Sequence, residues 1–249
     1  MASARPRLAI ILGSTLLVGL LAAAIGATLG AHHWKQDLRV RSVEILGNRV
    51  VSTEEIMHLA AIRPDTGLFE VDLRAVQLRV ASQLYIAHVA VTRNVPDGIT
   101  IEVTEREPVA VLPAGRLLAI DAEGRVLPPA RAEALFDLPA LTGIPVRELV
   151  PGTLLGGSGV HRALVLLRMA EQCSEELYRR ISEVHIQADS TLVVYTSESS
   201  VPVLFGKRDL ARKLVTFEGF WNSIVSRRGV TALQSVDMRF ADQVVARWQ

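Results

Sequence analysis

The stretch that decides the fold reads Ile86-Ala-His-Val-Ala-Val-Thr-Arg93, then Asn94-Val-Pro-Asp-Gly98, then Ile99-Thr-Ile-Glu-Val-Thr-Glu-Arg106. In the last segment, apolar Ile99, Ile101 and Val103 alternate with polar residues, which is typical of a strand with one buried face. Pro-Asp-Gly between the two segments predicts a tight turn, in which Pro fixes φ and Gly supplies a positive φ. The stretch therefore predicts a β-hairpin with one face on helices and one face in water.

A strand and two helices are expected before this hairpin. Val43 and Ile45 alternate with polar neighbours and predict a short strand. Ser52-Thr-Glu-Glu55 is a capping box that starts one helix, and Asp72 caps a second. Residues 40–107 are thus predicted to form a β-α-α-β-β domain, a three-stranded sheet covered by two helices. The apolar positions expected to face the sheet are Ile56, Leu59, Ala60, Leu73, Val76 and Val80.

Residues 108–249 have a different pattern, with many short strands and two strong helices. Asp121-Ala-Glu-Gly124 reads as a turn between two of the strands. One helix follows Gly159, with Val160, Leu164, Leu167, Ala170 and Leu177 on its apolar stripe. The second is capped by Asp209 and ended by Gly229, with Leu210, Leu214, Phe217, Trp221 and Ile224 on its stripe. Strands are expected at 110–112, 116–120, 126–127, 184–187, 192–196, 201–205, 236–240 and 244–248.

The amino-terminal part carries a long apolar run. No charge occurs from Leu8 to Ala31, and ~20 apolar residues suffice to cross a bilayer as a helix. The run predicts a single transmembrane helix at 8–31, between a cytoplasmic tail at 1–7 and a juxtamembrane linker at 32–39. A cleaved signal peptide is the alternative, but its apolar region spans only ~7–15 residues. The fold class is therefore α+β: one membrane helix, the domain at 40–107, and a mixed C-terminal β-domain with flanking helices at 108–249.

Composition and motifs exclude most kinds of chemistry. Lys+Arg 27 against Asp+Glu 26 gives a net charge of +1, so no global field attracts nucleic acid. The single cysteine, Cys173, excludes an internal disulfide and multi-cysteine metal sites. The Gly-rich segment 152–159 lacks the Lys that a phosphate loop needs. The sequence therefore predicts no catalytic residues, no metal ligands and no cofactor, which favours a binding module over an enzyme.

Several of these stretches, taken in order, resemble one protein family. They are Val43–Asn48 with Ser52–Glu55; Gly67–Asp72; Val91–Pro108; Ile120–Leu127 with Leu138–Gly143; and Gly206–Leu214 with Val236–Phe240 and Trp248. With the short basic tail and single span before them, they resemble the FtsQ/DivIB family of bacterial cell division proteins. The domain at 40–107 is similar to the POTRA (polypeptide-transport-associated) domain of that family.

The resemblance implies a non-enzymatic divisome scaffold, which links early division proteins to septal peptidoglycan synthesis through FtsB-like and FtsL-like partners. It also implies a single-pass plasma (inner) membrane protein at the division septum, with its C-terminal domains extracytoplasmic. Other divisome proteins are expected to bind the POTRA domain and the membrane helix. The partner site implied by the family, where a partner segment adds a strand to the β-domain, comprises Arg239, Phe240, Asp242, Val244, Val245, Arg247 and Trp248.

Two features of this site stay open at the level of sequence. Relatives have Tyr at the Phe240 position and a small residue at that of Asp242. In the last strand, Val244, Ala246 and Trp248 alternate with Val245 and Arg247, and either set could meet the partner. Pro at Val245 is expected to remove one backbone donor of this strand and so to weaken partner binding, while the domain at 40–107 stays folded. The alternative functions are a POTRA-containing secretion or transport component and an anchored cell-envelope enzyme.

We predict that the anchor is not cleaved and that the amino terminus stays in the cytoplasm. Protease should degrade residues 32–249 once the cell envelope is opened, because only the short tail lies on the inner side. Immunoblotting with tags at both ends checks this. Recovery of a mature protein that begins at His32 would contradict it.

Overall fold

The structure is a computed structural model that describes residues 19–26, 38–129, 137–240 and 243–249. The chain divides into two compact units, residues 1–104 and 105–249. Residues 19–26 are helical. Within the described residues, no helix combines the length and the apolar character needed to cross a membrane. The span predicted at 8–31 lies largely outside the described residues, so the anchor stays a prediction.

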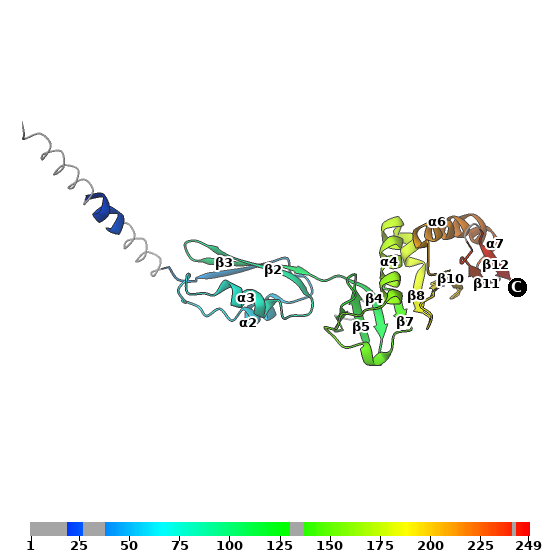
Figure 1. Cartoon of the computed structure of the whole chain (residues 1–249), viewed down its shortest axis with the longest axis horizontal. Helices are drawn as coiled ribbons and strands as arrows, with labels where there is room; N and C mark the ends of the chain where they lie inside the picture. Colours follow the sequence, from blue (N-terminus) through cyan, green and yellow to red (C-terminus); the bar gives the residue numbers. More distant parts are fainter. Residues whose placement is uncertain (1–18, 27–37, 130–136, 241–242) are drawn as a thin grey trace, which may run out of the picture. The chain divides into compact units, whose positions relative to one another are not determined.

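The first unit contains a three-stranded sheet with the order β1-β3-β2. Its strands are β1 (Ser42–Leu46), β2 (Ile86–Asn94) and β3 (Gly98–Glu105), and β1 pairs parallel to β3. The helices α2 (Thr53–Ala60) and α3 (Leu73–Val80) lie together on one face of this sheet (Figure 1). Buried Ile56, Ala60, Val76, Val80, Ile99, Ile101 and Val103 fill the space between helices and sheet. The predicted β-α-α-β-β order and its buried face are therefore present.

Both side-chain helix caps predicted in the first unit are formed. The Ser52 hydroxyl accepts a hydrogen bond from the Glu55 N–H at 3.2 Å, and the Asp72 carboxylate accepts one from the Ala75 N–H at 3.1 Å. The Glu55 carboxylate accepts a hydrogen bond from the side chain of Gln83 at 3.0 Å. Each cap satisfies a backbone donor that the first helical turn leaves without an internal partner.

The hairpin turn differs from the prediction at Gly98. The peptide bond before Pro96 is cis, and Gly98 does not have a positive φ. Gly98 is instead the first residue of β3, where a Cβ atom would lie 3.3 Å from Asn94 and from the Ser42 hydroxyl. A larger residue here would crowd these neighbouring atoms, so glycine suits this position by its small size and not by its conformational freedom.

The second unit contains a mixed sheet, nine-stranded in the described part of the chain, with the order β12-β11-β10-β9-β8-β7-β4-β5-β6. Three neighbouring pairs are parallel, namely β4 with β7, β7 with β8, and β10 with β11, and the others are antiparallel. The strands are β4 (Pro108–Pro113), β5 (Leu117–Asp121), β6 (Val126–Leu127), β7 (Ala140–Thr142), β8 (Ile181–Ile186), β9 (Leu192–Thr196), β10 (Pro202–Gly206), β11 (Leu233–Asp237) and β12 (Val245–Trp248). The strand predicted at 236–240 is therefore wrong in position, because β11 begins at Leu233.

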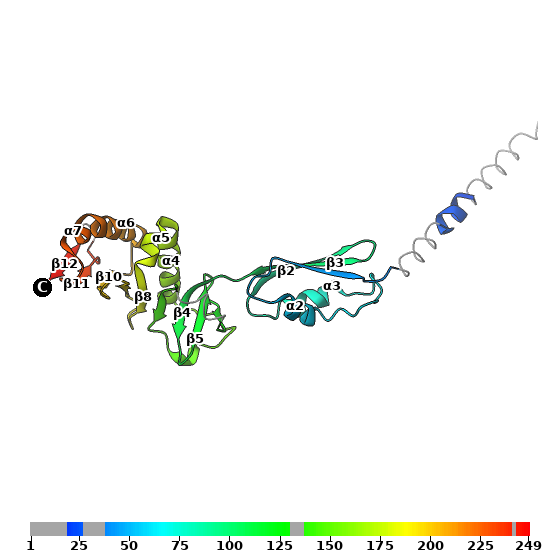
Figure 2. The same cartoon turned by 180° about the vertical axis from the view of Figure 1, so that it is seen from behind.

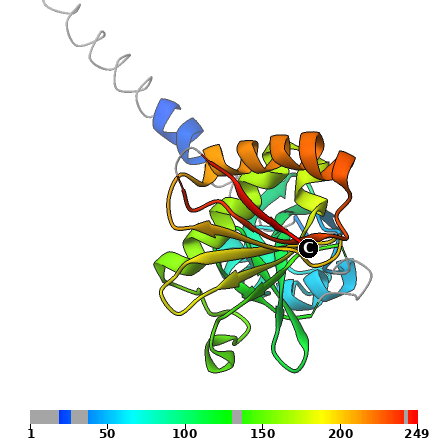
Figure 3. The same cartoon turned by 90° about the vertical axis from the view of Figure 1, so that its right-hand side faces the viewer.

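Helices cover one face of this sheet (Figures 1 and 3). They are α4 (Ser158–Cys173), α5 (Glu175–Arg179), α6 (Leu210–Phe220), the π-helical turn η3 (Trp221–Val225) and α7 (Ser226–Arg228). A short 3₁₀ turn, η2, occupies Val146–Glu148. The core between helices and sheet is fully apolar at its centre, with Leu112, Ile120, Leu141, Leu166, Phe205 and Phe217 all buried.

Two predicted helical stripes are corrected by the structure. Leu177 does not continue the first stripe, because α4 ends at Cys173 and α5 is a separate helix (Figure 2). Ser174 caps α5 and accepts a hydrogen bond from the Leu177 N–H at 3.0 Å. Ile224 is 46% exposed, whereas Val225 is 2% exposed. The π-helical turn adds one residue and rotates the following side chains, so Val225 takes the buried position.

The start of α6 also differs. Asp209 precedes the helix as predicted, but its φ is +56° and its side chain makes no capping hydrogen bond. Its predicted role as a side-chain cap is therefore wrong. The end of the helical segment is as predicted, since Gly229 has φ +86° and follows α7 directly.

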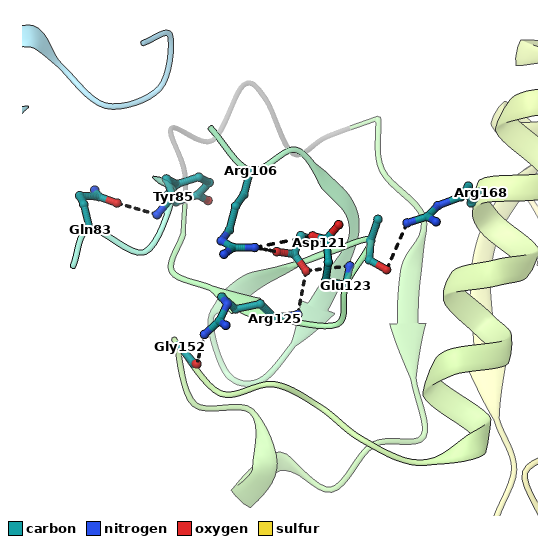
Figure 4. Close-up of polar contacts among 9 residues, drawn as sticks. Gln83, Tyr85, Arg106, Asp121, Glu123, Arg125, Gly152 and Arg168 are labelled. Atoms are coloured by element: carbon teal, nitrogen blue, oxygen red, sulfur yellow. Dashed lines mark hydrogen bonds and ion pairs between the residues drawn. The ribbon is translucent and has the colours of Figure 1, made fainter. Parts of the chain in front are cut away.

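A buried carboxylate organises the turn between β5 and β6 (Figure 4). Asp121 is 1% exposed and accepts hydrogen bonds from Arg106 Nη1 at 2.8 Å and from the N–H groups of Glu123 and Arg125 at 3.1 and 2.8 Å. Arg125 in turn donates to the Gly152 carbonyl at 2.9 Å. The predicted turn at 121–124 is confirmed, and Asp121 fixes the segment that begins the second unit.

We predict that Asp121→Ala destabilises the second unit by about 3 kcal/mol, because it leaves Arg106 and two backbone donors without their acceptor. Urea unfolding followed by fluorescence of Trp221 and Trp248, in a Trp34→Phe background, measures the change. Glu123→Ala is the comparison variant: its carboxylate lies 3.6 Å from the same Arg106 Nη1, but the Glu123 side chain is 66% exposed, so its removal costs only an exposed ion pair. Equal stability of the two variants would show that Asp121 is not a structural anchor.

We also predict that residues 40–107 fold as an isolated fragment. The two helices and the hairpin bury one continuous apolar face, and domains of about this size fold alone. Thermal unfolding should be cooperative by circular dichroism. Random-coil amide chemical shifts in the fragment would contradict this expectation.

Candidate functional site

The two edge strands of the nine-stranded sheet differ in whether another segment of the described chain pairs with their outer side. At the β6 edge, residues 152–155 run alongside the strand: the Gly152 N–H donates to the Val126 carbonyl and the Val126 N–H to the Thr153 carbonyl, at 2.7 and 2.9 Å. The Leu155 N–H donates to the Gly124 carbonyl at 2.8 Å. At the other end, no strand of the described chain pairs with the outer side of β12. The exposed backbone edge of this sheet is therefore β12.

The register of β12 shows which backbone groups face outward. β12 is antiparallel to β11, with Asp237 opposite Val245 and Ser235 opposite Arg247, and the Gln249 N–H donates to the Ala232 carbonyl at 2.8 Å. Because N–H groups alternate along a strand, those of Val245 and Arg247 also face β11. The N–H and C=O groups of Ala246 and Trp248 therefore face outward.

This register corrects the expectation for Val245. Its N–H lies on the β11 side, so Pro at Val245 would disrupt the existing sheet and not the outer edge. The outward donor nearest to it is the N–H of Ala246. Sequence alternation alone gives the two sets of side chains but not the direction of the backbone donors.

The structure also shows which side chains of β12 face the core and which are exposed. Val244, Ala246 and Trp248 are half-buried and pack against the core of the second unit. Val245 is 39% exposed, and Arg247 is exposed on the opposite face of the strand. Figure 2 shows β12 beside β11 at the carboxyl end of the chain. One set thus holds the strand in place, while the other is accessible.

Two further side-chain contacts lie at this edge. The Arg228 guanidinium lies over the Trp248 ring, 4.4 Å from its centroid, in a cation–π contact. Arg239 donates from Nε and Nη2 to the Asp237 carboxylate at 3.0 and 2.7 Å. Hydrogen bonds from Arg239 hold the pKa of Asp237 below its usual range, and the ion pair raises the pKa of Arg239.

Phe240 is 48% exposed. With Arg239 and Val244 it lines a pocket of about 270 Å³ against the first turns of α6. Lys213 also lines this pocket; it is 8% exposed and donates a hydrogen bond to the Phe205 carbonyl at 2.7 Å. Burial lowers the pKa of Lys213. An aromatic ring and a basic helix start therefore lie next to the open strand edge.

The predicted site residues thus fall into groups. Val244, Val245, Arg247 and Trp248 lie in or beside the edge strand, and Arg239 and Phe240 follow β11. Asp242 lies outside the described residues.

The sequence prediction missed Asp237 and Arg228. Asp237 could have been found, because it stands two residues before Arg239 and such residues share a face of an extended strand. Arg228 depends on the π-helical turn, for which the sequence carries no clear signal.

The described residues contain no group of three or more His, Cys, Asp or Glu side chains arranged to hold a metal ion. The chemistry available at the β12 edge is that of backbone donors and acceptors, flanked by an aromatic ring and cationic side chains. Such an edge can bind another extended chain.

Comparisons with known proteins agree with this architecture. A family model described as "POTRA domain, FtsQ-type" matches residues 38–106, and one described as "Cell division protein FtsQ/DivIB, C-terminal" matches residues 110–239. The chain is 32% identical over 223 residues to a Rhodothermus marinus protein named "Cell division protein FtsQ", covering 86% of this chain and 79% of the relative. Proteins of the same name from Geobacter sp. strain M21 and Salinibacter ruber are 28% and 27% identical, over 90% and 94% of this chain and 84% and 91% of their own lengths.

The fold and the two matched models define a protein built from a POTRA domain and a mixed α/β C-terminal domain. The chain belongs to the FtsQ/DivIB family of cell division proteins. The resemblance seen in the sequence is thereby confirmed. The matched C-terminal model ends at Arg239, just before the segment that leads into β12.

Proposed function

We propose that this protein is a non-enzymatic scaffold of the bacterial divisome, which links early division proteins to septal peptidoglycan synthesis by binding an FtsB-like protein in complex with an FtsL-like one. Membership of the family supports a role in cell division. The observation that carries the finer proposal is the contrast between the covered β6 edge and the open β12 edge. A sheet that covers one end and leaves the other open is suited to accept a strand.

The partner segment pairs with the outer side of β12. Ala246 and Trp248 supply two backbone donors and two acceptors to it, each hydrogen bond contributing about 0.5–1.5 kcal/mol net. Four such bonds alone give a weak complex, because association costs several kcal/mol of lost freedom. Phe240, Val245 and Arg247 add side-chain contacts, and exposed Phe240 is the aromatic residue best placed to anchor the partner.

The remaining assignments complete the proposal. Residues 1–7 form a cytoplasmic tail, residues 8–31 a membrane helix, 32–39 a linker, 40–107 the POTRA domain and 108–249 the partner-binding β-domain. The uncharged run at 8–31 supports the anchor. The protein then resides in the plasma membrane at the septum, and its POTRA domain and membrane helix bind other divisome proteins.

We predict that Ala246→Pro weakens partner binding about tenfold, because it removes one outward donor and leaves the β11–β12 hydrogen bonds intact. Binding of the extracytoplasmic segment of the FtsB-like protein from the same organism is measured by calorimetry. Ala246→Ser keeps the N–H and is the matched control. Circular dichroism verifies that both variants are folded.

Equal affinity of the Ala246→Pro variant and the parent would contradict strand addition. In dividing cells, a fluorescent fusion of the full chain should gather at midcell. Uniform membrane fluorescence would favour a POTRA-containing transport component over a division scaffold.

A further inference from the structure

The edge strand has few attachments to the rest of the second unit. β12 is four residues long and has one neighbouring strand. Its last residues are held by the pairing of Trp248 with Leu233 and by the Gln249 N–H bond to the Ala232 carbonyl. A short strand with a single neighbouring strand opens at low cost in free energy. Contacts at Trp248 therefore decide how often the outer edge is correctly formed.

Trp248 is contacted from two directions. It packs against the hydrophobic core, and the Arg228 guanidinium lies over its ring at 4.4 Å. Tryptophan gives the strongest cation–π contact among the aromatic residues, and an exposed contact of this kind is worth a factor of about two to five in an equilibrium. Arg228 is exposed, so this modest range applies to it.

The π-helical turn is what brings Arg228 to this position. Phe217 and Trp221 lie on the buried stripe of the helix, and an unbroken α-helix would continue that stripe through Ile224 to Arg228. The Ser226 N–H instead donates to the Trp221 carbonyl, five residues back, and Val225 becomes the buried residue. The extra residue rotates Arg228 off the buried stripe by roughly 100°. Gly229, with φ +86°, then ends the helix directly after Arg228.

We infer that Arg228 is a positioning residue for the partner-binding edge: by its contact with Trp248 it holds β12 formed in the free protein, so that a partner strand meets a ready template. The role of Arg228 in holding β12 is independent of the proposed function, while its effect on binding rests on that function. Pre-forming the edge raises the fraction of molecules that can bind, and the apparent dissociation constant falls in proportion.

A direct contact between Arg228 and the partner has a different kinetic signature. A positioning residue changes the population of the competent edge, so its loss slows association and leaves dissociation unchanged. A residue that touches the partner instead slows dissociation, and its loss raises the dissociation rate.

The test uses residue-resolved hydrogen–deuterium exchange on the full chain in lipid nanodiscs. Arg228→Gln removes the charge, Arg228→Lys keeps a cation near the ring, and Arg227→Gln removes the neighbouring charge on the same turn. The amides of Arg247 and Gln249, which face β11, should exchange about two to five times faster in Arg228→Gln. Arg228→Lys should restore most of the protection, and Arg227→Gln should match the parent.

Association of the extracytoplasmic segment of the FtsB-like protein should then slow in Arg228→Gln in proportion to the fall in the formed fraction of β12 that the exchange rates give, at an unchanged dissociation rate. Unchanged exchange in Arg228→Gln, or equal acceleration in Arg227→Gln, would overturn the inference whatever the binding result. A raised dissociation rate would overturn it in favour of direct contact. Faster exchange with an association rate that does not follow the formed fraction of β12 would uphold the role of Arg228 in holding β12 and contradict strand addition as the function of this edge.

Discussion

A β-sheet that is not closed into a barrel must end in two strands whose outer N–H and C=O groups have no partner within the sheet, and this constraint governs the second unit of the protein. At β6 the outer groups are satisfied by residues 152–155 of the same chain. At β12 the described chain offers no further strand. The position of the open edge follows from the spatial order of the strands, in which β12 has β11 as its one neighbour.

The rest of the unit keeps this edge in a defined position. Half-buried Ala246 and Trp248 attach β12 to a core built by α4, α6 and the inner face of the sheet. The ion pair of Arg239 with Asp237 lies on the neighbouring strand, directly opposite Val245. The π-helical turn departs from regular helix geometry and so buries Val225 and brings Arg228 over Trp248. The π-helical turn therefore connects the buried core, through Val225, with the edge strand β12, through Arg228. We propose that β12 binds a partner.

Sequence patterns predicted what depends on local alternation and local caps. Ile99, Ile101 and Val103 gave the buried face of β3, and Ser52 gave the start of α2, because each signal acts within a few residues. The failures arise where residues distant in sequence meet or where the backbone leaves regular geometry: the approach of Ser42 to Gly98, the π-helical turn that exposes Ile224, and the positive φ of Asp209. The site shows the same division. Alternation separated Val245 and Arg247 from Ala246 and Trp248, but the outward direction of the Ala246 donor required the register with β11.

The central claim is that the outer side of β12 accepts a partner strand through Ala246 and Trp248. Residue-resolved hydrogen exchange of these amides, with and without the extracytoplasmic segment of the FtsB-like protein, tests it most directly. Strand addition predicts that the Ala246 and Trp248 amides become protected on binding, and that their protection rises more than that of Val245 and Arg247, whose amides are already directed at β11. Binding that leaves the Ala246 and Trp248 amides as exposed as in the free protein would contradict the account.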